Sequence, residues 1–197
     1  MLPGMKPDNN RAITLIELII SIILMGMVML GFYGIDIFSH QQLISVDKRS
    51  LVQNEAIFTL SHMSKHLLTV IGDRENPGVT ISSSGATIVA TIDSSGDGIR
   101  DLASDYNISY CFNSSGCNAD VPRYTILFNS NMSASPAPTE VISSHVRSFN
   151  AILNENLLTL QISTCWQPSG IHQACGTLDN PAVNMNNTIR MPSVSVQ

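Results

Sequence analysis

The hydrophobic positions of this chain change their spacing twice, and the three patterns predict three kinds of structure. Residues 15–30 are almost continuously apolar, which predicts a helix that is hydrophobic on all sides. From residue 39 to 71 there is no Pro or Gly, and apolar residues recur every three or four positions, as on one face of an amphipathic helix. Beyond residue 72 the period falls to two, which predicts β-strands.

The amphipathic stretch predicts which side of the helix packs on a folded domain. The residues spaced for that face are Ile57, Leu60, Ser64, Leu67 and Ile71, widened by Val52, Ala56 and Met63. Gly72 is expected to end the helix. Together with the apolar run, this predicts one helix from Ile13 to Ile71, about 90 Å long at ~1.5 Å per residue.

After Gly72, apolar and polar residues alternate in several segments joined by short polar turns. These segments are residues 86–92, 106–112, 124–128 and 158–162, with a further arm over 141–153 that leads into a hairpin turn at 154–156. We therefore expect an α+β fold in which an antiparallel sheet of about four strands packs on the outer half of the helix. Residues 129–139 are expected to form an exposed loop, and the tail from Gln167 on, rich in Asn and Pro, is expected to be irregular.

A single carboxylate interrupts the apolar run near its start. Eighteen uncharged residues separate Glu17 from Asp36, close to the ~20 that a membrane-spanning helix requires. Glu17 therefore lies at or inside the hydrocarbon boundary, where an ionised group costs roughly 2.5–3.5 kcal/mol and needs a partner. Because the apolar run contains no Lys or Arg, the compensating cation has to come from elsewhere.

Residues 12–19, Ala-Ile-Thr-Leu-Ile-Glu-Leu-Ile, resemble the processing site of type IV prepilins. In that family a leader is removed, the new terminal amine is methylated, and an acid at mature position five faces a neighbouring subunit's amine. The resemblance implies cleavage between Ala12 and Ile13 by a prepilin peptidase, N-methylation of Ile13, and an assembly role for Glu17. The family prefers Gly where this chain has Ala12. A cationic amine docked on the carboxylate would make its burial tolerable.

Two other interpretations of the N-terminal segment compete with a prepilin leader. A secretory signal peptide would use Lys6 and Arg11 as its positive flank, but no small-x-small cleavage site follows the apolar run. An ordinary signal anchor would account for the hydrophobicity and leave Glu17 unexplained. In each case Lys6 and Arg11 should stay in the cytoplasm, so the C-terminal part of the chain is expected to be exported.

The outer helix over residues 54–68 is similar to that of minor pilins of the PilW class and of J-type pseudopilins of type II secretion. The resemblance implies a pilin-like organisation with four parts: a leader (1–12), a filament-core half of the helix (13–38), an amphipathic half (39–71) and an exported β-rich domain (72–197). It also implies a single-pass precursor in the bacterial inner membrane, facing the periplasm, which joins other pilin or pseudopilin subunits in a filament through an inner-membrane assembly platform.

The charge balance of the chain is acidic. The whole sequence has 10 Lys and Arg against 15 Asp and Glu, and removing the leader with Lys6, Asp8 and Arg11 leaves 8 against 14, a balance of −6. From Gly72 on there are five Arg, no Lys and ten acids. Such a surface lacks the basic stripe that phosphate backbones require, so no nucleic acid partner is expected.

The four cysteines all lie in the part expected to be exported, where an oxidising compartment permits disulfides. They are Cys111, Cys117, Cys165 and Cys175. Three connectivities are open, and the sequential one is favoured because each short interval contains turn-forming residues. A zinc site is the competing interpretation, although neither interval has the short spacing usual for zinc ligands.

One segment has part of the pattern of a calcium loop. Asp93, Ser95, Asp97 and Asp101 occupy positions 1, 3, 5 and 9, with Gly at position 6. Position 12, however, is Ser104 in place of Glu. A strand-to-strand turn closed by Asx hydrogen bonds explains the same residues. Ca²⁺ is thus the single candidate cofactor, and the turn is the alternative.

Signals for catalysis are few. His62 and His66 are four residues apart on the predicted helix, a spacing that can bind metal, but no metalloprotease or nucleophile motif surrounds any histidine. Polar positions on a helix surface explain this pair more simply. We expect a structural protein and no enzyme: a minor pilin or pseudopilin subunit. The alternatives are an adhesin-like binding module at a filament tip, contacting a substrate through the Cys165–Cys175 loop, and an anchored domain that never assembles.

Overall fold

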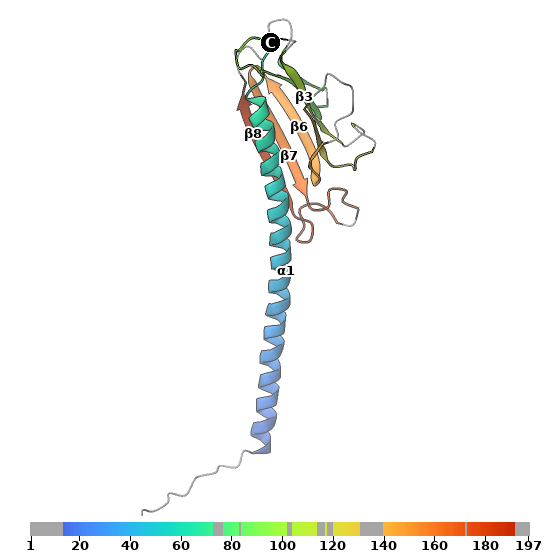
Figure 1. Cartoon of the computed structure of the whole chain (residues 1–197). Helices are drawn as coiled ribbons and strands as arrows, with labels where there is room; N and C mark the ends of the chain where they lie inside the picture. The colour runs from blue at the N-terminus through green and yellow to red at the C-terminus, as the bar shows by residue number, and fades with distance from the viewer. Residues whose placement is uncertain are drawn as a thin grey trace, which may run out of the picture. The chain divides into compact units, whose positions relative to one another are not determined.

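The computed structural model describes residues 14–72, 77–82, 84–101, 104–113, 117, 120–130, 140–171 and 173–191. These residues form one long helix followed by eight strands (Figure 1). The elements are α1 (Leu15–Leu67), β1 (Val79–Ile81), β2 (Thr87–Ile92), β3 (Tyr106–Phe112), β4 (Ile126–Asn129), β5 (Glu140–Ser143), β6 (Val146–Asn154), β7 (Leu157–Cys165) and β8 (Ala182–Arg190). The chain divides into two compact units, residues 1–44 and 45–197, at a point inside α1.

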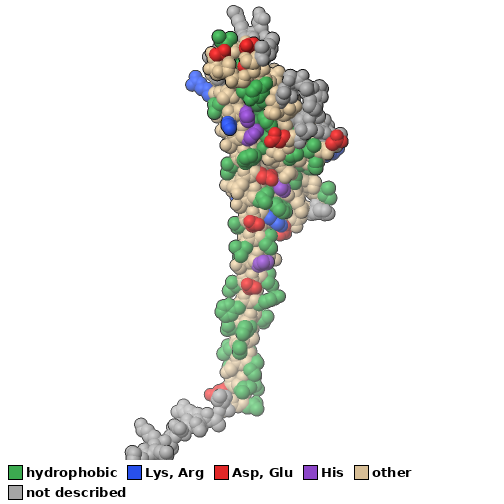
Figure 2. Space-filling model, viewed as in Figure 1, with side chains coloured by type: hydrophobic (Ala, Val, Ile, Leu, Met, Phe, Trp, Pro, Cys, Tyr) green, Lys and Arg blue, Asp and Glu red, His purple; other side chains and the backbone are tan. Residues whose placement is uncertain are grey.

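The first unit contains the N-terminal part of α1, whose apolar side chains are exposed. Every large hydrophobic residue from Leu15 to Ile44 is at least 42% exposed, and Figure 2 shows hydrophobic side chains along the surface of this part of the helix. Among the described residues, α1 is the one helix long and apolar enough to cross a membrane, judged by length and composition. Within this unit, nothing described covers that surface.

The second unit contains two antiparallel sheets. One has the strand order β1-β2-β3-β4-β5 and the other β6-β7-β8. The predicted α+β class, with a long N-terminal helix and antiparallel pairing, is confirmed. The predicted hairpin turn is confirmed as well, since β6 ends at Asn154 and β7 begins at Leu157. The strands are more numerous than the four or so expected, and they form two sheets instead of one.

Two local features account for the additional strands. The arm predicted over 141–153 is interrupted at Ser144 and His145, so that β5 joins the first sheet and β6 the second. The prediction of an irregular tail was wrong for residues 182–190, which form β8. Val183, Met185 and Ile189 alternate there with exposed polar residues, but the high Asn content masked this period of two.

Six residues of α1 pack on the core of the second unit: Val52, Ala56, Thr59, Leu60, Met63 and Leu67. Most of the predicted face is therefore correct, but Ile57 is 48% exposed and Thr59 is buried in its place. Thr59 tolerates burial because its hydroxyl donates to the Glu55 carbonyl at 2.8 Å, which satisfies the polar group.

The helix ends at Leu67, four residues before the predicted end at Ile71. Val70 forms an isolated antiparallel bridge with Ile92, and the Ile71 N–H donates to the Thr91 carbonyl at 2.9 Å. Both Val70 and Ile71 are buried. The chain leaves the helix early because these two β-branched residues bury their side chains by pairing beside β2.

Two hydrogen bonds fasten the second sheet to the outer part of α1. The buried Thr164 hydroxyl donates to the Val52 carbonyl at 3.0 Å, and the Asn187 amide donates to the Ser64 hydroxyl at 2.7 Å. The apolar residues Leu158, Leu160 and Ile162 of β7 are buried in the same core. The sheet and this part of the helix thus share one core.

Candidate functional site

Glu17 closes the N-terminus of α1. Its carboxylate accepts hydrogen bonds from the Thr14 N–H and the Thr14 hydroxyl, both at 3.0 Å, while the Glu17 N–H donates to the Thr14 hydroxyl oxygen at 3.4 Å. This reciprocal arrangement is a capping box, in which two N-terminal donors of a helix are satisfied by two side chains. The Thr-x-x-Glu spacing in the sequence is the signal that could have identified it.

The predicted cleavage and methylation residues, Ala12 and Ile13, lie outside the described residues. Cleavage and methylation therefore stay predictions. What the structure describes is the segment that follows them: a capped helix with one carboxylate in its first turn and exposed apolar side chains beyond.

The glycines of this segment also lie open. A Cβ atom added at Gly26, Gly31 or Gly34 would meet no described atom within 4 Å. Small residues of this kind allow the backbones of two helices to approach closely. Residues 18–35 can thus offer an uncharged, unobstructed helical surface to lipid or to other helices.

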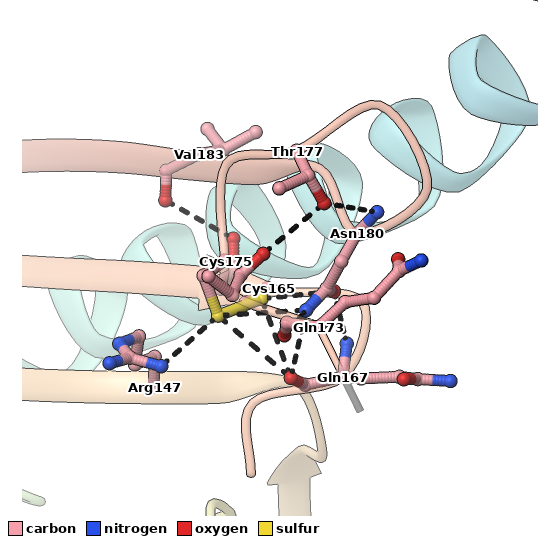
Figure 3. Close-up of a disulfide and its surroundings, with 10 residues drawn as sticks. Arg147, Cys165, Gln167, Gln173, Cys175, Thr177, Asn180 and Val183 are labelled. Atoms are coloured by element: carbon pink, nitrogen blue, oxygen red, sulfur yellow. Dashed lines mark hydrogen bonds between the residues drawn. A yellow bond between two sulfur atoms is a disulfide. The ribbon is translucent and has the colours of Figure 1, made fainter. Parts of the chain in front are cut away.

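The cysteines form the sequential pairs of the three connectivities open to them. Cys111 is bonded to Cys117 and Cys165 to Cys175, with Cα–Cα distances of 6.3 and 5.9 Å. Asn180, which is fully buried and follows the second disulfide loop, accepts a hydrogen bond from the Gln167 N–H at 2.8 Å and donates to the Gln173 carbonyl at 2.9 Å (Figure 3). The loop is thereby held by side-chain bonds as well as by the disulfide.

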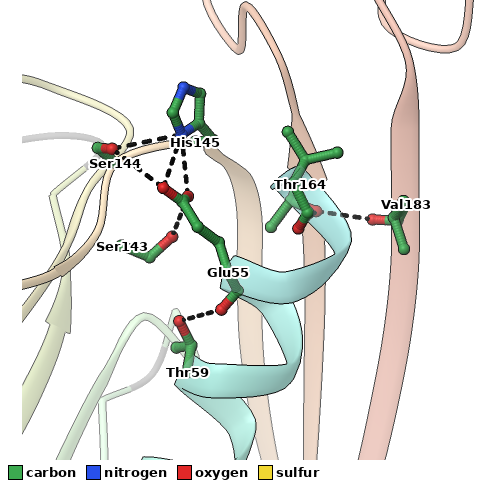
Figure 4. A network of polar contacts seen from close by, with 8 residues as sticks. Glu55, Thr59, Ser143, Ser144, His145, Thr164 and Val183 are labelled. Atoms are coloured by element: carbon green, nitrogen blue, oxygen red, sulfur yellow. Dashed lines mark hydrogen bonds and ion pairs between the residues drawn. The ribbon is translucent and has the colours of Figure 1, made fainter. Parts of the chain in front are cut away.

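A polar cluster links α1 to the start of β6. Both carboxylate oxygens of Glu55 lie 2.9 Å from His145 Nδ1, and the Ser143 hydroxyl donates to Glu55 at 3.1 Å (Figure 4). Burial opposes ionisation of Glu55, but the hydrogen bond and charge of His145, with the bond from Ser143, outweigh it. The pKa of Glu55 therefore lies below its usual value.

The same cluster contains the single tryptophan of the chain. Trp166 stacks on His145 with ring centroids 5.4 Å apart and an interplanar angle of 11°. Lys48 Nζ lies 5.9 Å from the Trp166 ring centroid and donates to the Asp179 carbonyl at 3.2 Å. Sequence reasoning did not find this cluster, because no spacing pattern relates residues as distant in the chain as Glu55 and His145.

His62 and His66 belong to an aromatic cluster and are not simply polar surface residues. The Tyr110 hydroxyl and His62 Nδ1 are hydrogen-bonded at 3.1 Å, and Phe128 lies 5.0 and 5.4 Å from the rings of His62 and His66. Burial lowers the pKa of both imidazoles, against the opposing charge of Glu140. Within the described ranges, no three His, Cys, Asp or Glu side chains gather in a way that could hold a metal ion.

The carboxylates of the predicted calcium loop bind their own backbone. Asp93 accepts hydrogen bonds from the Gly96 N–H at 2.6 Å and the Gly98 N–H at 3.0 Å. Asp97 accepts one from the Ile99 N–H at 2.8 Å. The hydrogen bonds that Asp93 accepts stabilise its ionised carboxylate and hold the pKa of Asp93 below its usual value, and the bond from the Gly98 N–H has the largest effect. This arrangement matches the turn that the sequence offered as the alternative. Calcium binding stays a prediction.

Comparison with known proteins identifies the N-terminal segment. Residues 7–33 match the prokaryotic N-terminal methylation motif. This match confirms the prepilin-type motif predicted from residues 12–19, and with it a structural protein and not an enzyme. The chain is also similar to the solved structure of a type IV-like pilin from Thermus thermophilus. The two sequences are 10% identical, and the match covers 73% of this chain and 97% of the other. The TM-score is 0.44, which is too low to support an argument about function. Among curated proteins no significant match is found.

Proposed function

We propose that this chain is the precursor of a minor pilin or of a type II secretion pseudopilin. In this proposal a prepilin peptidase cuts between Ala12 and Ile13, the new amine of Ile13 is methylated, and the subunit enters a filament through α1. The observation that carries the proposal is the methylation motif over residues 7–33, directly joined to a helix whose apolar side chains are exposed.

The physical reason lies in the apolar surface of the first unit. A helix that is hydrophobic on all sides is not stable in water and has to be covered by lipid or by other helices. A single-pass precursor in the inner membrane satisfies this need before assembly, and the packed helices of a filament satisfy it afterwards. The exported domain, acidic and without Lys from Gly72 on, would lie on the outside of the filament.

In the assembled state Glu17 would face the terminal amine of another subunit. Its carboxylate would then exchange a local bond to Thr14 for a charged partner in a region of low dielectric constant, where an ion pair is strong. The partners implied are other pilin or pseudopilin subunits, the peptidase and an inner-membrane assembly platform.

Replacing Glu17 tests this assembly role. Glu17→Leu should insert into the membrane as the wild type does but should be lost from sheared filaments, whereas Ser21→Ala, one turn further along the same surface, should be incorporated normally. Intact-mass and N-terminal analysis of both fractions should find the methylated Ile13 terminus. Two results would show that the proposal is wrong and that the chain is an anchored domain. One is normal incorporation of Glu17→Leu into filaments. The other is a wild-type chain that keeps its Met1 terminus and is found in membranes but not in filaments.

A further inference from the structure

The two sheets have four edge strands among the described residues, and three of them are short or covered. β1 has three residues. β5 has four, begins with Glu140 and follows an irregular register. β6 is covered by the first sheet and its loops, since the Ala151 N–H donates to the Gly85 carbonyl at 2.9 Å and the Val146 N–H to the Tyr124 carbonyl at 3.0 Å. Short, charged, irregular or covered edges resist pairing with other chains.

The fourth edge, β8, has none of these protections. It has nine residues and pairs with β7 in an uninterrupted register. It contains no Pro, Lys, Asp or Glu, and its one charged residue, Arg190, lies at its end. A long, regular and uncharged edge is a template for an additional strand.

The hydrogen bonds at the two ends of β8 show which of its backbone groups are open. The Trp166 N–H donates to the Pro181 carbonyl, and the Met191 N–H donates to the Asn156 carbonyl. In an antiparallel ladder, bonded and non-bonded positions alternate, so the odd-numbered residues of β8 bond to β7. The N–H and C=O groups of Asn184, Asn186 and Thr188 therefore point away from β7. No described group forms a hydrogen bond with them.

A groove of about 560 Å³ runs beside this edge. It is lined by Ile57, Leu60, Ser61 and Ser64 of α1 and by residues 184–187 of β8, none of them charged. Ile57, nearly half exposed, lies in this lining. The odd-numbered side chains of β8 face α1, and neighbouring strands keep the same face. A strand added to β8 would thus place every second side chain toward the groove.

We propose that β8 and this groove form a docking site for an extended segment of another exported polypeptide. The segment would pair antiparallel with β8, bond to Asn184, Asn186 and Thr188, and place uncharged apolar side chains toward Ile57. Main-chain bonds would supply affinity and the groove would select the alternate side chains. A second copy of β8, paired about Asn186, would instead place its polar Asn187 in the groove beside Met185. A second copy therefore fits the apolar part of the groove less well than a segment with apolar side chains at these positions.

A synthetic peptide of nine alternating Thr and Val residues, capped at both ends and fluorescently labelled, serves as the probe. Binding is measured by anisotropy on the full chain in detergent, together with hydrogen exchange at single amides. Saturable binding is expected, with exchange at residues 184, 186 and 188 slowed at least tenfold. The amides that bond to β7 should change little.

The pairing geometry provides matched peptides. Residues that face solvent would direct their N–H groups to β8, because they lie opposite the outward-bonding positions. A peptide N-methylated at its Thr residues should therefore lose at least tenfold in affinity. A peptide N-methylated at its Val residues, whose N–H groups would point away from β8, should bind within about threefold of the unmodified peptide.

Variants of the chain test the same edge. Asn186→Pro removes an outward donor at a site where an edge strand can accept Pro, and should lose at least tenfold in peptide affinity. Asn186→Ser should keep the affinity of the wild type, and Glu17→Leu should too, which separates this inference from the proposed function. Should Asn186→Pro prove unfolded by circular dichroism, the N-methylated peptides decide alone.

Three results would overturn the inference: no saturable binding, equal binding of the two N-methylated peptides, or equal binding by a folded Asn186→Pro variant. A fourth result would overturn it as well: a concentration-dependent dimer of the full chain that Asn186→Pro abolishes, which would assign the edge to a second copy.

Discussion

The contact of Glu55 with His145 is the interaction between α1 and the sheets that is most open to a direct test. Glu55→Gln keeps the shape of the side chain and removes its charge. The Ser143 hydroxyl can still donate to the Gln carbonyl, so the change acts mainly on the contact with His145. The stability of the second unit should fall.

The exposure of the two side chains sets the size of the effect. Hydrogen bonds to charged groups contribute ~1.5–3 kcal/mol when well buried, while exposed ion pairs contribute ~0–1 kcal/mol. The side chains of His145 and Glu55 are 23% and 26% exposed, which places the contact between these limits. We expect a loss of about 1–2 kcal/mol at pH 7. At ~2–4 °C per kcal/mol for a domain of this size, the midpoint of thermal unfolding should fall by about 2–8 °C.

Trp166 makes the assay specific to this site. It is the single tryptophan of the chain and stacks on His145, so its fluorescence reports directly on the cluster during thermal unfolding of the full chain in detergent. Glu155→Gln, an equivalent change at an exposed hairpin turn, is the control and should shift the midpoint by less than about 2 °C.

The pH dependence follows from the lowered pKa of Glu55. A carboxyl whose pKa is lower in the folded than in the unfolded state stabilises the fold above its unfolded pKa, here 4.5, and loses this contribution as the pH falls through the folded value. The difference between wild type and Glu55→Gln should therefore be complete above about pH 5 and should shrink below pH 4. Equal midpoints at pH 7, or a difference that grows in acid, would refute the reasoning.

Three further predictions concern the core, the second disulfide and the acidic turn. Met63→Ala should cost about 2–5 kcal/mol because Met63 is fully buried, whereas the exposed Leu68→Ala should change the stability by less than about 0.5 kcal/mol in the same fluorescence assay. Replacing Cys165 and Cys175 together by Ala should cost about 2–4 kcal/mol, measured by urea unfolding, and reducing agent should then have no further effect at this loop. If the acidic turn binds calcium, EDTA should lower the thermal midpoint of the wild type and leave Asp93→Asn unaffected; an unchanged wild type excludes the calcium site.

The parts of the fold that follow a simple local period could be predicted from the sequence. The helix, its buried face and the β6-β7 hairpin depend on spacing within a short stretch of chain, so local reasoning identified them. Even there, tertiary contacts changed the details. Val70 and Ile71 fit a helix by their spacing, but pairing beside β2 buries them as extended chain.

Features that depend on contacts between distant residues could not be predicted in the same way. Glu55 and His145 meet because β6 begins beside α1, and no local pattern encodes that proximity. β8 was not predicted for another reason: Asn is disfavoured in strands. In the structure, pairing with β7 along nine residues outweighs this low propensity. Since every second residue of β8 faces solvent, Asn at those positions costs little, and the strand is stabilised by its odd-numbered side chains.

The capping box at Thr14 changes what a partner of Glu17 has to provide. From the sequence, the carboxylate is an isolated charge that needs an external cation. In the structure it already accepts two hydrogen bonds from Thr14, so a lone precursor need not leave it without a partner. An incoming amine would have to compete with these bonds, and it can do so because it is charged while the Thr14 donors are neutral. Charge is therefore the property by which Glu17 would distinguish a processed neighbour from the acyl chains of lipid, since Thr14 already supplies it with hydrogen bonds.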